Sequence, residues 1–257
     1  MRTVLIVAIV AAWITSAGAV ETSAGATAAA ERARAASDYL EPKKPVIKEL
    51  RNYQSMVNAV FDAAFAPDVK VRAIVEPSFF REYAVGIKER SGHYYVFGME
   101  PRVQLWGYEL LALFKSQAIV AVSADGSGAN DDEIAALQAR LPKKTSDVRV
   151  MRCYSELDPR LARRVIAVWE GMLSELKASD RLGLDGESYQ FAFREGAREL
   201  EGQIWSPEEG SRGALLTDIA YTMKRLCTWG PPWSFFLRAR LAREVGDLEK
   251  RVGVQRR

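Results

Sequence analysis

The sequence predicts an α+β fold in which antiparallel hairpins pack with amphipathic helices. Stretches of alternating apolar and polar residues come in neighbouring pairs joined by short turns, and longer stretches repeat apolar residues every three or four positions. Consecutive strands that form hairpins favour an antiparallel sheet over a doubly wound parallel one. The chain has 257 residues, 48% hydrophobic and 27% charged, a composition that excludes intrinsic disorder and a polytopic membrane protein.

The first nineteen residues have the pattern of a secretory signal peptide. Arg2 gives a positive start, residues 4–14 are an unbroken apolar run, and Ala17-Gly18-Ala19 offers a cleavage site between small residues. A membrane-spanning helix needs about 20 apolar residues, so this run is short for an anchor; an uncleaved N-terminal anchor is the alternative. We therefore expect a Sec-type signal peptide over residues 1–19 and a periplasmic or secreted protein without a transmembrane anchor.

The remaining residues divide into a lead-in and one predicted domain. Removal of residues 1–19 takes away Arg2 and no acidic residue, which leaves 35 basic and 33 acidic residues and a net charge of +2. A charge this small and evenly spread does not favour a nucleic-acid partner. Residues 20–36 are rich in Ala, Gly, Ser and Thr and predict a flexible lead-in, part of which alanine can make helical. Residues 37–257 predict a single domain, with the loop-like residues 124–132 as its one candidate seam.

The first half of this domain begins with a predicted helix and continues with strands. Apolar residues recur at steps of three and four over residues 45–65, which predicts an amphipathic helix that stops near Pro67. Residues 69–75, 83–87 and 93–99 are rich in alternating β-branched and aromatic residues. These three segments predict three antiparallel strands.

The second half alternates between strand and helix patterns. Residues 148–153 predict one more strand, and Asp158-Pro159 opens a helix with an acceptor cap and a proline in the first turn. A hairpin and two final helices follow, and they cover residues 189–193, 200–205, 213–227 and 235–252.

Cys153 and Cys227 are the only cysteines of the chain. In an oxidising compartment, two cysteines of one domain usually pair. Their bond would close a loop of roughly 75 residues and stabilise the fold by about 4 kcal/mol. We expect this disulfide; two separate buried thiols are the alternative. One histidine and two distant cysteines do not supply the ligands of a zinc site, so we expect no metal or other cofactor.

Motifs of known catalytic chemistry are not found in the sequence. His93 is the only histidine and lies at a strand start beside Tyr94 and Tyr95, so a structural role is expected. The sequence has no serine-hydrolase elbow and no glycine-rich phosphate loop. Acidic pairs such as Asp131-Asp132 and Glu208-Glu209 supply carboxylates, but sequence neighbours do not show the separation that a glycosidase needs.

The last predicted helix combines apolar and basic residues. From residue 235 to the end, seven basic and three acidic residues give a local charge of +4. A terminal helix docked on the core explains this pattern, and an amphipathic contact with anionic lipid or an acidic partner is the alternative. The apolar residues placed at helical spacing are Phe235, Phe236, Leu237, Leu241, Val245, Leu248 and Val252.

Several short motifs lie between Cys153 and Cys227. They are a helix with Trp169, residues 183–191 (Gly-Leu-Asp-Gly-Glu-Ser-Tyr-Gln-Phe) and residues 202–207 (Gly-Gln-Ile-Trp-Ser-Pro). Together they resemble a group of uncharacterised exported proteins of proteobacteria, over less than a third of the chain. The resemblance implies an exported protein and brings no catalytic residues with it.

Three aromatic residues of the predicted hairpin, Tyr189, Phe191 and Trp205, are expected to pack on one of its faces. The alternative is that these rings line a surface for a ligand or a protein partner.

We expect an exported, non-enzymatic protein that binds a protein or a cell-envelope component, for example as an inhibitor or an immunity protein. The alternative is a cell-envelope hydrolase whose acidic residues the sequence does not identify. A cleft that gathers carboxylates or His93 with shifted pKa values would favour the hydrolase. An exposed aromatic or apolar patch would favour the binding protein. The pattern does not indicate an oligomeric state.

Overall fold

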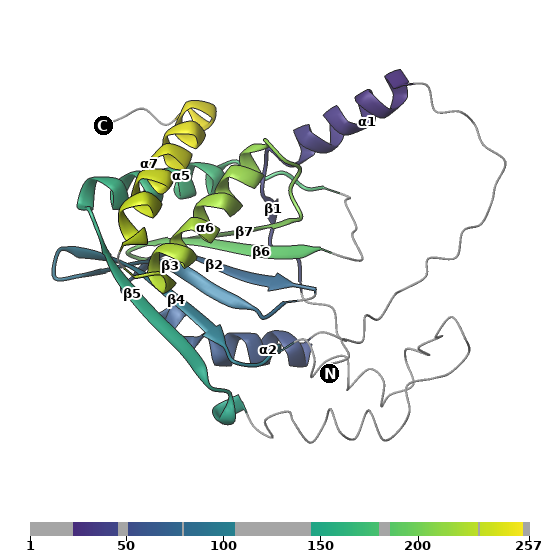
Figure 1. Ribbon diagram of the computed structural model, residues 1–257. Helices are drawn as coiled ribbons and strands as arrows, with labels where there is room; N and C mark the ends of the chain where they lie inside the picture. The colour runs from purple at the N-terminus through teal and green to yellow at the C-terminus, as the bar shows by residue number, and fades with distance from the viewer. Residues whose placement is uncertain are drawn as a thin grey trace, which may run out of the picture.

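The structure is a computed structural model that describes residues 23–45, 51–78, 80–105, 145–179, 186–230 and 232–253. All strands in these residues join one antiparallel sheet, with helices on both of its faces (Figure 1). The predicted α+β class is therefore confirmed. The predicted signal peptide and the candidate seam at residues 124–132 lie outside the described residues.

The sheet has seven strands in the order β1-β7-β6-β2-β3-β4-β5. Strands β2 to β5 follow one another as a meander, whereas the β6–β7 hairpin adds to the other side of β2 and short β1 pairs with β7. The strand bounds are β1 (Glu41–Pro42), β2 (Val69–Pro77), β3 (Tyr83–Arg90), β4 (His93–Pro101), β5 (Val150–Leu157), β6 (Glu187–Glu195) and β7 (Arg198–Trp205).

Local sequence patterns explain most of these strands. The predicted strands β2 to β7 are confirmed, and only β1 was not predicted, because two residues carry no pattern of their own. The turn between β3 and β4 shows the local chemistry: Arg90 pairs with His93, and Ser91 and Gly92 have φ values of 51° and 79°. Positive φ at both central residues suits a two-residue hairpin, and glycine adopts it without strain.

Three helices cover one face of the sheet: α5 (Pro159–Ser174), α6 (Arg212–Thr228) and α7 (Trp233–Val252) (Figure 1). As predicted, Asp158 caps α5, because its Oδ1 accepts hydrogen bonds from the backbone N–H groups of Arg160 (2.9 Å) and Leu161 (3.0 Å). The core beneath these helices includes Val85, Ile87, Trp169, Phe191, Leu216, Leu241 and Val245.

The other face of the sheet is covered by α2 (Arg51–Val60) and the 3₁₀ helix η2 (Asp62–Phe65). These elements occupy the described part of the helix predicted for residues 45–65. They bury a second, smaller core against β2, β3 and β4. Its members include Tyr53, Val57, Phe61, Ile74, Phe97 and Met99.

Part of the predicted lead-in is helical: α1 spans Ser23–Ala36 and extends away from the sheet (Figure 1). Ser37, the residue after α1, contacts the domain, because its carbonyl accepts a hydrogen bond from the Gly213 N–H over 2.9 Å. The 3₁₀ helix η3 (Thr145–Asp147) precedes β5.

Candidate functional site

The turn between α6 and α7 carries exposed aromatic residues. Helix α6 ends at Thr228, and the Trp229 N–H still donates to the Arg225 carbonyl over 2.8 Å. Helix α7 begins at Trp233, whose N–H donates to the Gly230 carbonyl over 3.2 Å. This short, hydrogen-bonded connection holds the two helix ends together.

Five aromatic side chains on and beside this turn point into solvent, and we call them the aromatic surface. Their exposed fractions are 46% for Tyr221, 43% for Trp229, 56% for Trp233, 74% for Phe235 and 64% for Phe236. Ring centroids lie 6.3 Å apart for Trp229 and Trp233, 6.5 Å for Trp233 and Phe236, and 5.7 Å for Phe235 and Phe236. The rings thus form one continuous patch rather than isolated exposed residues.

Arg225 joins Tyr221 to the rest of the aromatic surface. Its guanidinium carbon lies 3.9 Å from the Trp229 ring centroid and 5.8 Å from that of Tyr221. Both distances lie within the range of cation–π attraction. One arginine therefore extends the patch along α6.

Basic residues predominate in the segment that carries the aromatic surface, and exposed Asp218 lies one turn before Tyr221. Residues 221–243 contain five basic residues and no acidic one. Two of the five form ion pairs: Lys224 with Glu100 over 2.8 Å and Arg240 with Glu244 over 2.6 Å. The other three, Arg225, Arg238 and Arg243, have no ion pair with a carboxylate among the described residues.

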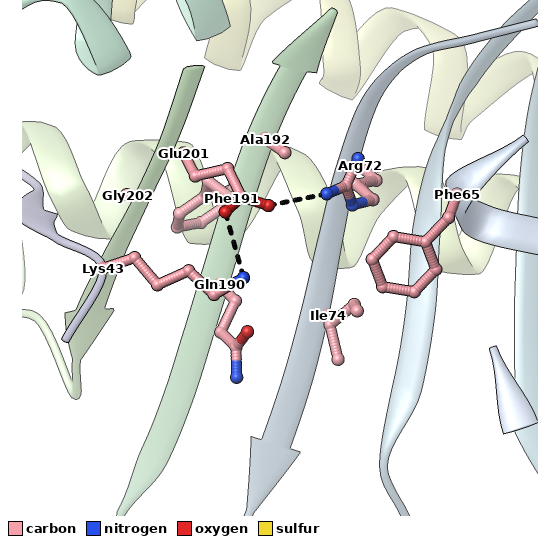
Figure 2. Close-up of a pocket in the computed structure, with 9 residues that line it drawn as sticks. All are labelled: Lys43, Phe65, Arg72, Ile74, Gln190, Phe191, Ala192, Glu201 and Gly202. Carbon is pink, nitrogen blue, oxygen red and sulfur yellow. Dashed lines mark hydrogen bonds and ion pairs between the residues drawn. The ribbon is translucent and has the colours of Figure 1, made fainter. Parts of the chain in front are cut away.

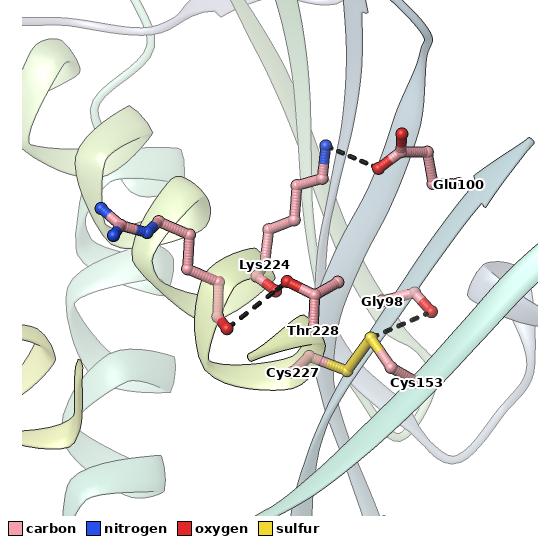
Figure 3. Close-up of a disulfide and its surroundings, with 7 residues drawn as sticks. Gly98, Glu100, Cys153, Lys224, Cys227 and Thr228 are labelled. Carbon is pink, nitrogen blue, oxygen red and sulfur yellow. Dashed lines mark hydrogen bonds and ion pairs between the residues drawn. A yellow bond between two sulfur atoms is a disulfide. The ribbon is translucent and has the colours of Figure 1, made fainter. Parts of the chain in front are cut away.

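A disulfide fixes the end of α6 to the sheet (Figure 3). Cys153 of β5 and Cys227 of α6 are bonded, with their Cα atoms 5.5 Å apart, so the predicted pair is confirmed. Cys227 precedes the aromatic Trp229 by two residues, and the bond therefore anchors the base of the aromatic surface. Gly98 lies beneath it, where a Cβ would be only 2.8 Å from the Cys153 sulfur.

The aromatic residues singled out in the sequence lie elsewhere. Tyr189 and Phe191 are 8% and 2% exposed and pack beneath the helices, so neither ring is available to a partner. Burial raises the pKa of Tyr189, whose hydroxyl donates to Glu187. The expectation that Trp205 shares their face is wrong: Tyr189 pairs with Ile204, so half-buried Trp205 points to the opposite face.

Helix α7 docks on the core as predicted, but Phe235 and Phe236 do not take part. Leu237, Leu241 and Val245 are buried in the core that α7 shares with α5 and α6, whereas both phenylalanines are exposed. At 3.6 residues per turn, Phe236 lies about 100° and Phe235 about 200° around the helix from Leu237. Their assignment to the docked side is therefore wrong.

His93 lies on the surface, where its ring is within hydrogen-bond distance of Glu156. Its Nδ1 is 3.0 Å from Glu156 Oε1, and both side chains are 61% exposed. Such a solvent-exposed pair is a surface feature with little energetic weight.

A polar pocket lies on the other face of the sheet, over β2, β6 and β7 (Figure 2). It is small, with about 10 Å³ of space for water, which is room for about one water molecule. Arg72 is 5% exposed and donates to Glu199 (3.0 Å) and Glu201 (2.8 Å), and Lys43 also pairs with Glu201 over 3.0 Å. The charged side chains that line the pocket are thus paired with one another.

Two carboxylates lie near the end of this face. Glu82 is fully buried and accepts hydrogen bonds from Tyr53 Oη (3.1 Å) and the backbone N–H of Leu105 (2.7 Å). Glu76 is half-buried and accepts from Gln190 Nε2 over 2.9 Å. Burial, followed by the negative charge of Glu82, raises the pKa of Glu76 to about 7.

Within the described segments, no group of three or more His, Cys, Asp or Glu side chains is placed to hold a metal ion. None of the helices described combines the length and apolar character that a bilayer crossing needs.

Comparisons with protein-family models, with curated proteins and with solved structures find no match for this chain. The resemblance to exported proteobacterial proteins therefore stays a prediction.

Sequence reasoning missed Trp229 and Trp233 as surface residues. The signal that could have found them is the density of aromatic residues in residues 229–236, Trp-Gly-Pro-Pro-Trp-Ser-Phe-Phe. A helix-breaking turn cannot bury four large rings on both of its sides, so aromatic residues at such a position indicate an exposed patch.

Proposed function

We propose that this chain is an exported, non-enzymatic binding protein that docks on a protein or a cell-envelope component through the aromatic surface. The continuous patch of four exposed rings, which Arg225 extends to Tyr221, is the observation that carries the proposal, since contiguous apolar patches on a protein surface mark interaction sites. Tryptophan, tyrosine and arginine are also the residues enriched where binding energy is concentrated. Inhibition of a hydrolase or neutralisation of a toxin is one concrete form of this function.

Export is part of the proposal. The signal-peptide pattern of residues 1–19 and the disulfide between Cys153 and Cys227 both support a periplasmic or secreted protein. The partner would accordingly be a component of the envelope or of the extracellular medium.

Site-specific photo-crosslinking tests the proposal. A photoreactive phenylalanine analogue at position 236 should give an adduct in envelope preparations, because its ring lies within the aromatic surface. The same analogue in place of Tyr154 is the matched control, since that ring is 54% exposed and lies on the opposite face of the sheet, beside Lys88. No adduct from position 236, or the same adduct from both positions, would overturn the proposal.

A cell-envelope hydrolase is the second candidate function, and Glu76 is the observation that favours it. A carboxyl group with a pKa near 7 can act as an acid at neutral pH. The hydrolase ranks second because the neighbouring carboxylate, Glu82, is buried and already accepts hydrogen bonds from Tyr53 and Leu105. Turnover of a cell-wall polymer that is lost in Glu76→Gln and kept in Glu195→Gln would establish this alternative.

A further inference from the structure

The rings of the aromatic surface stand out from the protein. Phe235, Phe236 and Trp233 are each more than half exposed, and they come from the first turn of α7 and not from the walls of a groove. A partner protein has to supply complementary pockets for such rings. The interface of a lipid bilayer accepts protruding aromatic rings without any pocket.

The charges around the rings have the sign that an anionic bilayer attracts. Arg238 and Arg243 are exposed, and Arg238 donates only to the backbone carbonyl of Glu156, over 2.8 Å. A carbonyl does not neutralise the guanidinium, so the charge of Arg238 remains on the surface. Each basic residue near an anionic membrane surface strengthens binding roughly fivefold.

The backbone of α7 adds to this positive field. The 20-residue helix begins at Trp233 with no side-chain cap and no acidic residue in its first turn. The positive end of the helix dipole and its N–H groups therefore lie among the exposed rings, where they favour an anionic group.

The disulfide and the core keep this arrangement in place. Cys227 fixes the end of α6 to β5, and Leu237, the first buried residue of α7, follows Phe236 directly. The aromatic surface is thus presented by anchored helices, which lowers the entropy lost on binding.

From these four observations we infer that the aromatic surface docks on the headgroup region of an anionic phospholipid bilayer, with its rings inserted and its arginines facing lipid phosphates. This inference rests on the proposed binding function and names its partner. Contact would be peripheral and reversible, and it would weaken as salt concentration rises.

Vesicle co-sedimentation of the oxidised protein tests the inference. The probes are vesicles of phosphatidylglycerol mixed with phosphatidylcholine and vesicles of phosphatidylcholine alone. We expect binding to the first and at least tenfold weaker binding to the second. Trp233→Ser/Phe235→Ser should lower binding to the anionic vesicles at least tenfold, and Arg238→Gln and Arg243→Gln roughly fivefold each. Tyr154→Ser, the matched control on the opposite face, should bind like the wild type.

Failure of the inference can be told apart from failure of the proposed function. Absence of vesicle binding, or equal binding by the wild type and Trp233→Ser/Phe235→Ser, overturns the lipid inference. If a protein adduct then forms from position 236, the binding function stands with a protein as its partner. If sedimentation equilibrium instead shows a dimer that the double variant loses, the occupant is a second copy of this chain. If position 236 forms no adduct with protein, lipid or a second copy of the chain, both proposals fall.

Discussion

The guanidinium of Arg225 lies against the ring of Trp229, 3.9 Å from its centroid, and its Nε has no hydrogen-bond partner among the described residues. The positive charge is therefore covered by an aromatic ring on one side instead of being paired with a carboxylate. Because the same guanidinium carbon lies 5.8 Å from the centroid of the Tyr221 ring, one arginine links Tyr221 of α6 to Trp229, which follows the end of that helix. This contact places a cation inside the aromatic surface itself.

Exposed rings contribute little to stability, so their removal should leave the fold intact. For Trp233→Ser/Phe235→Ser we expect a change in the free energy of unfolding within about 0.5 kcal/mol of the wild type. Urea denaturation followed by circular dichroism checks this. Leu241→Ala, which removes a fully buried side chain of the same helix, is the contrasting variant and should cost about 2 to 5 kcal/mol. A loss of similar size in the double variant would show that the rings belong to the core.

The disulfide should carry a substantial share of the stability. Cys153 and Cys227 are 74 residues apart, and release of such a loop in the unfolded chain costs about 4 kcal/mol of stability. We expect this loss in Cys153→Ser/Cys227→Ser, measured by urea denaturation. Dithiothreitol should destabilise the wild type by a similar amount and leave the double variant unchanged. A wild type that does not respond to reductant would contradict the bond.

Gly98 should be required only when the disulfide is present. A Cβ at this position would lie 2.8 Å from the Cys153 sulfur and 3.5 Å from the Cys227 sulfur. Gly98→Ala should therefore destabilise the oxidised protein by about 1 to 3 kcal/mol. A double-mutant cycle with Cys153→Ala/Cys227→Ala should recover most of that loss. Gly230→Ala is the matched control, because a Cβ there meets nothing within 4 Å.

Glu76 should make stability fall as pH rises from about 4.5 to about 7. Its pKa is raised from 4.5 to about 7 in the fold, so the folded protein binds the proton more tightly than the unfolded chain does. Its contribution is fully present below pH 4.5 and is lost as pH passes through 7. At about 1.4 kcal/mol per pKa unit, the loss reaches at most about 3 kcal/mol.

Glu76→Gln should remove this part of the pH dependence, because the amide keeps an acceptor for Gln190 and does not titrate. The variant should then be more stable than the wild type above pH 7, as measured by urea denaturation across the pH range. Glu195→Gln, at the exposed last residue of β6, serves as the control. Parallel pH profiles for the wild type and Glu76→Gln would refute the assignment.

Local patterns predicted the elements of the fold well, because alternation and helical spacing are properties of neighbouring residues. The order of the strands in the sheet could not be predicted in the same way. The pairing of Val75 with Tyr189 places β6 beside β2, across more than one hundred residues of chain. No local pattern encodes such a contact; it depends on which apolar faces meet in the folded state.

The candidate site was predicted less well than the fold. The disulfide could be expected from export and cysteine count, whereas the aromatic surface could not. Phe235 and Phe236 were predicted to lie on the side of the helix that docks on the core. The rotation of about 100° per residue excludes both from the face of Leu237. The predicted position of Trp205 was wrong for a related reason: only its pairing with Ser188 shows which face of the sheet it occupies.

The bond between Cys153 and Cys227 closes a ring of polypeptide that contains α5, β6, β7 and most of α6. A protease that cuts one peptide bond inside this ring, such as a bond in the exposed turn at Gly196, leaves two segments that are still covalently one molecule. The nicked protein would run as a single band on a non-reducing gel and as two bands after reduction. The ring thus lets the protein remain one covalent molecule after its first cleavage.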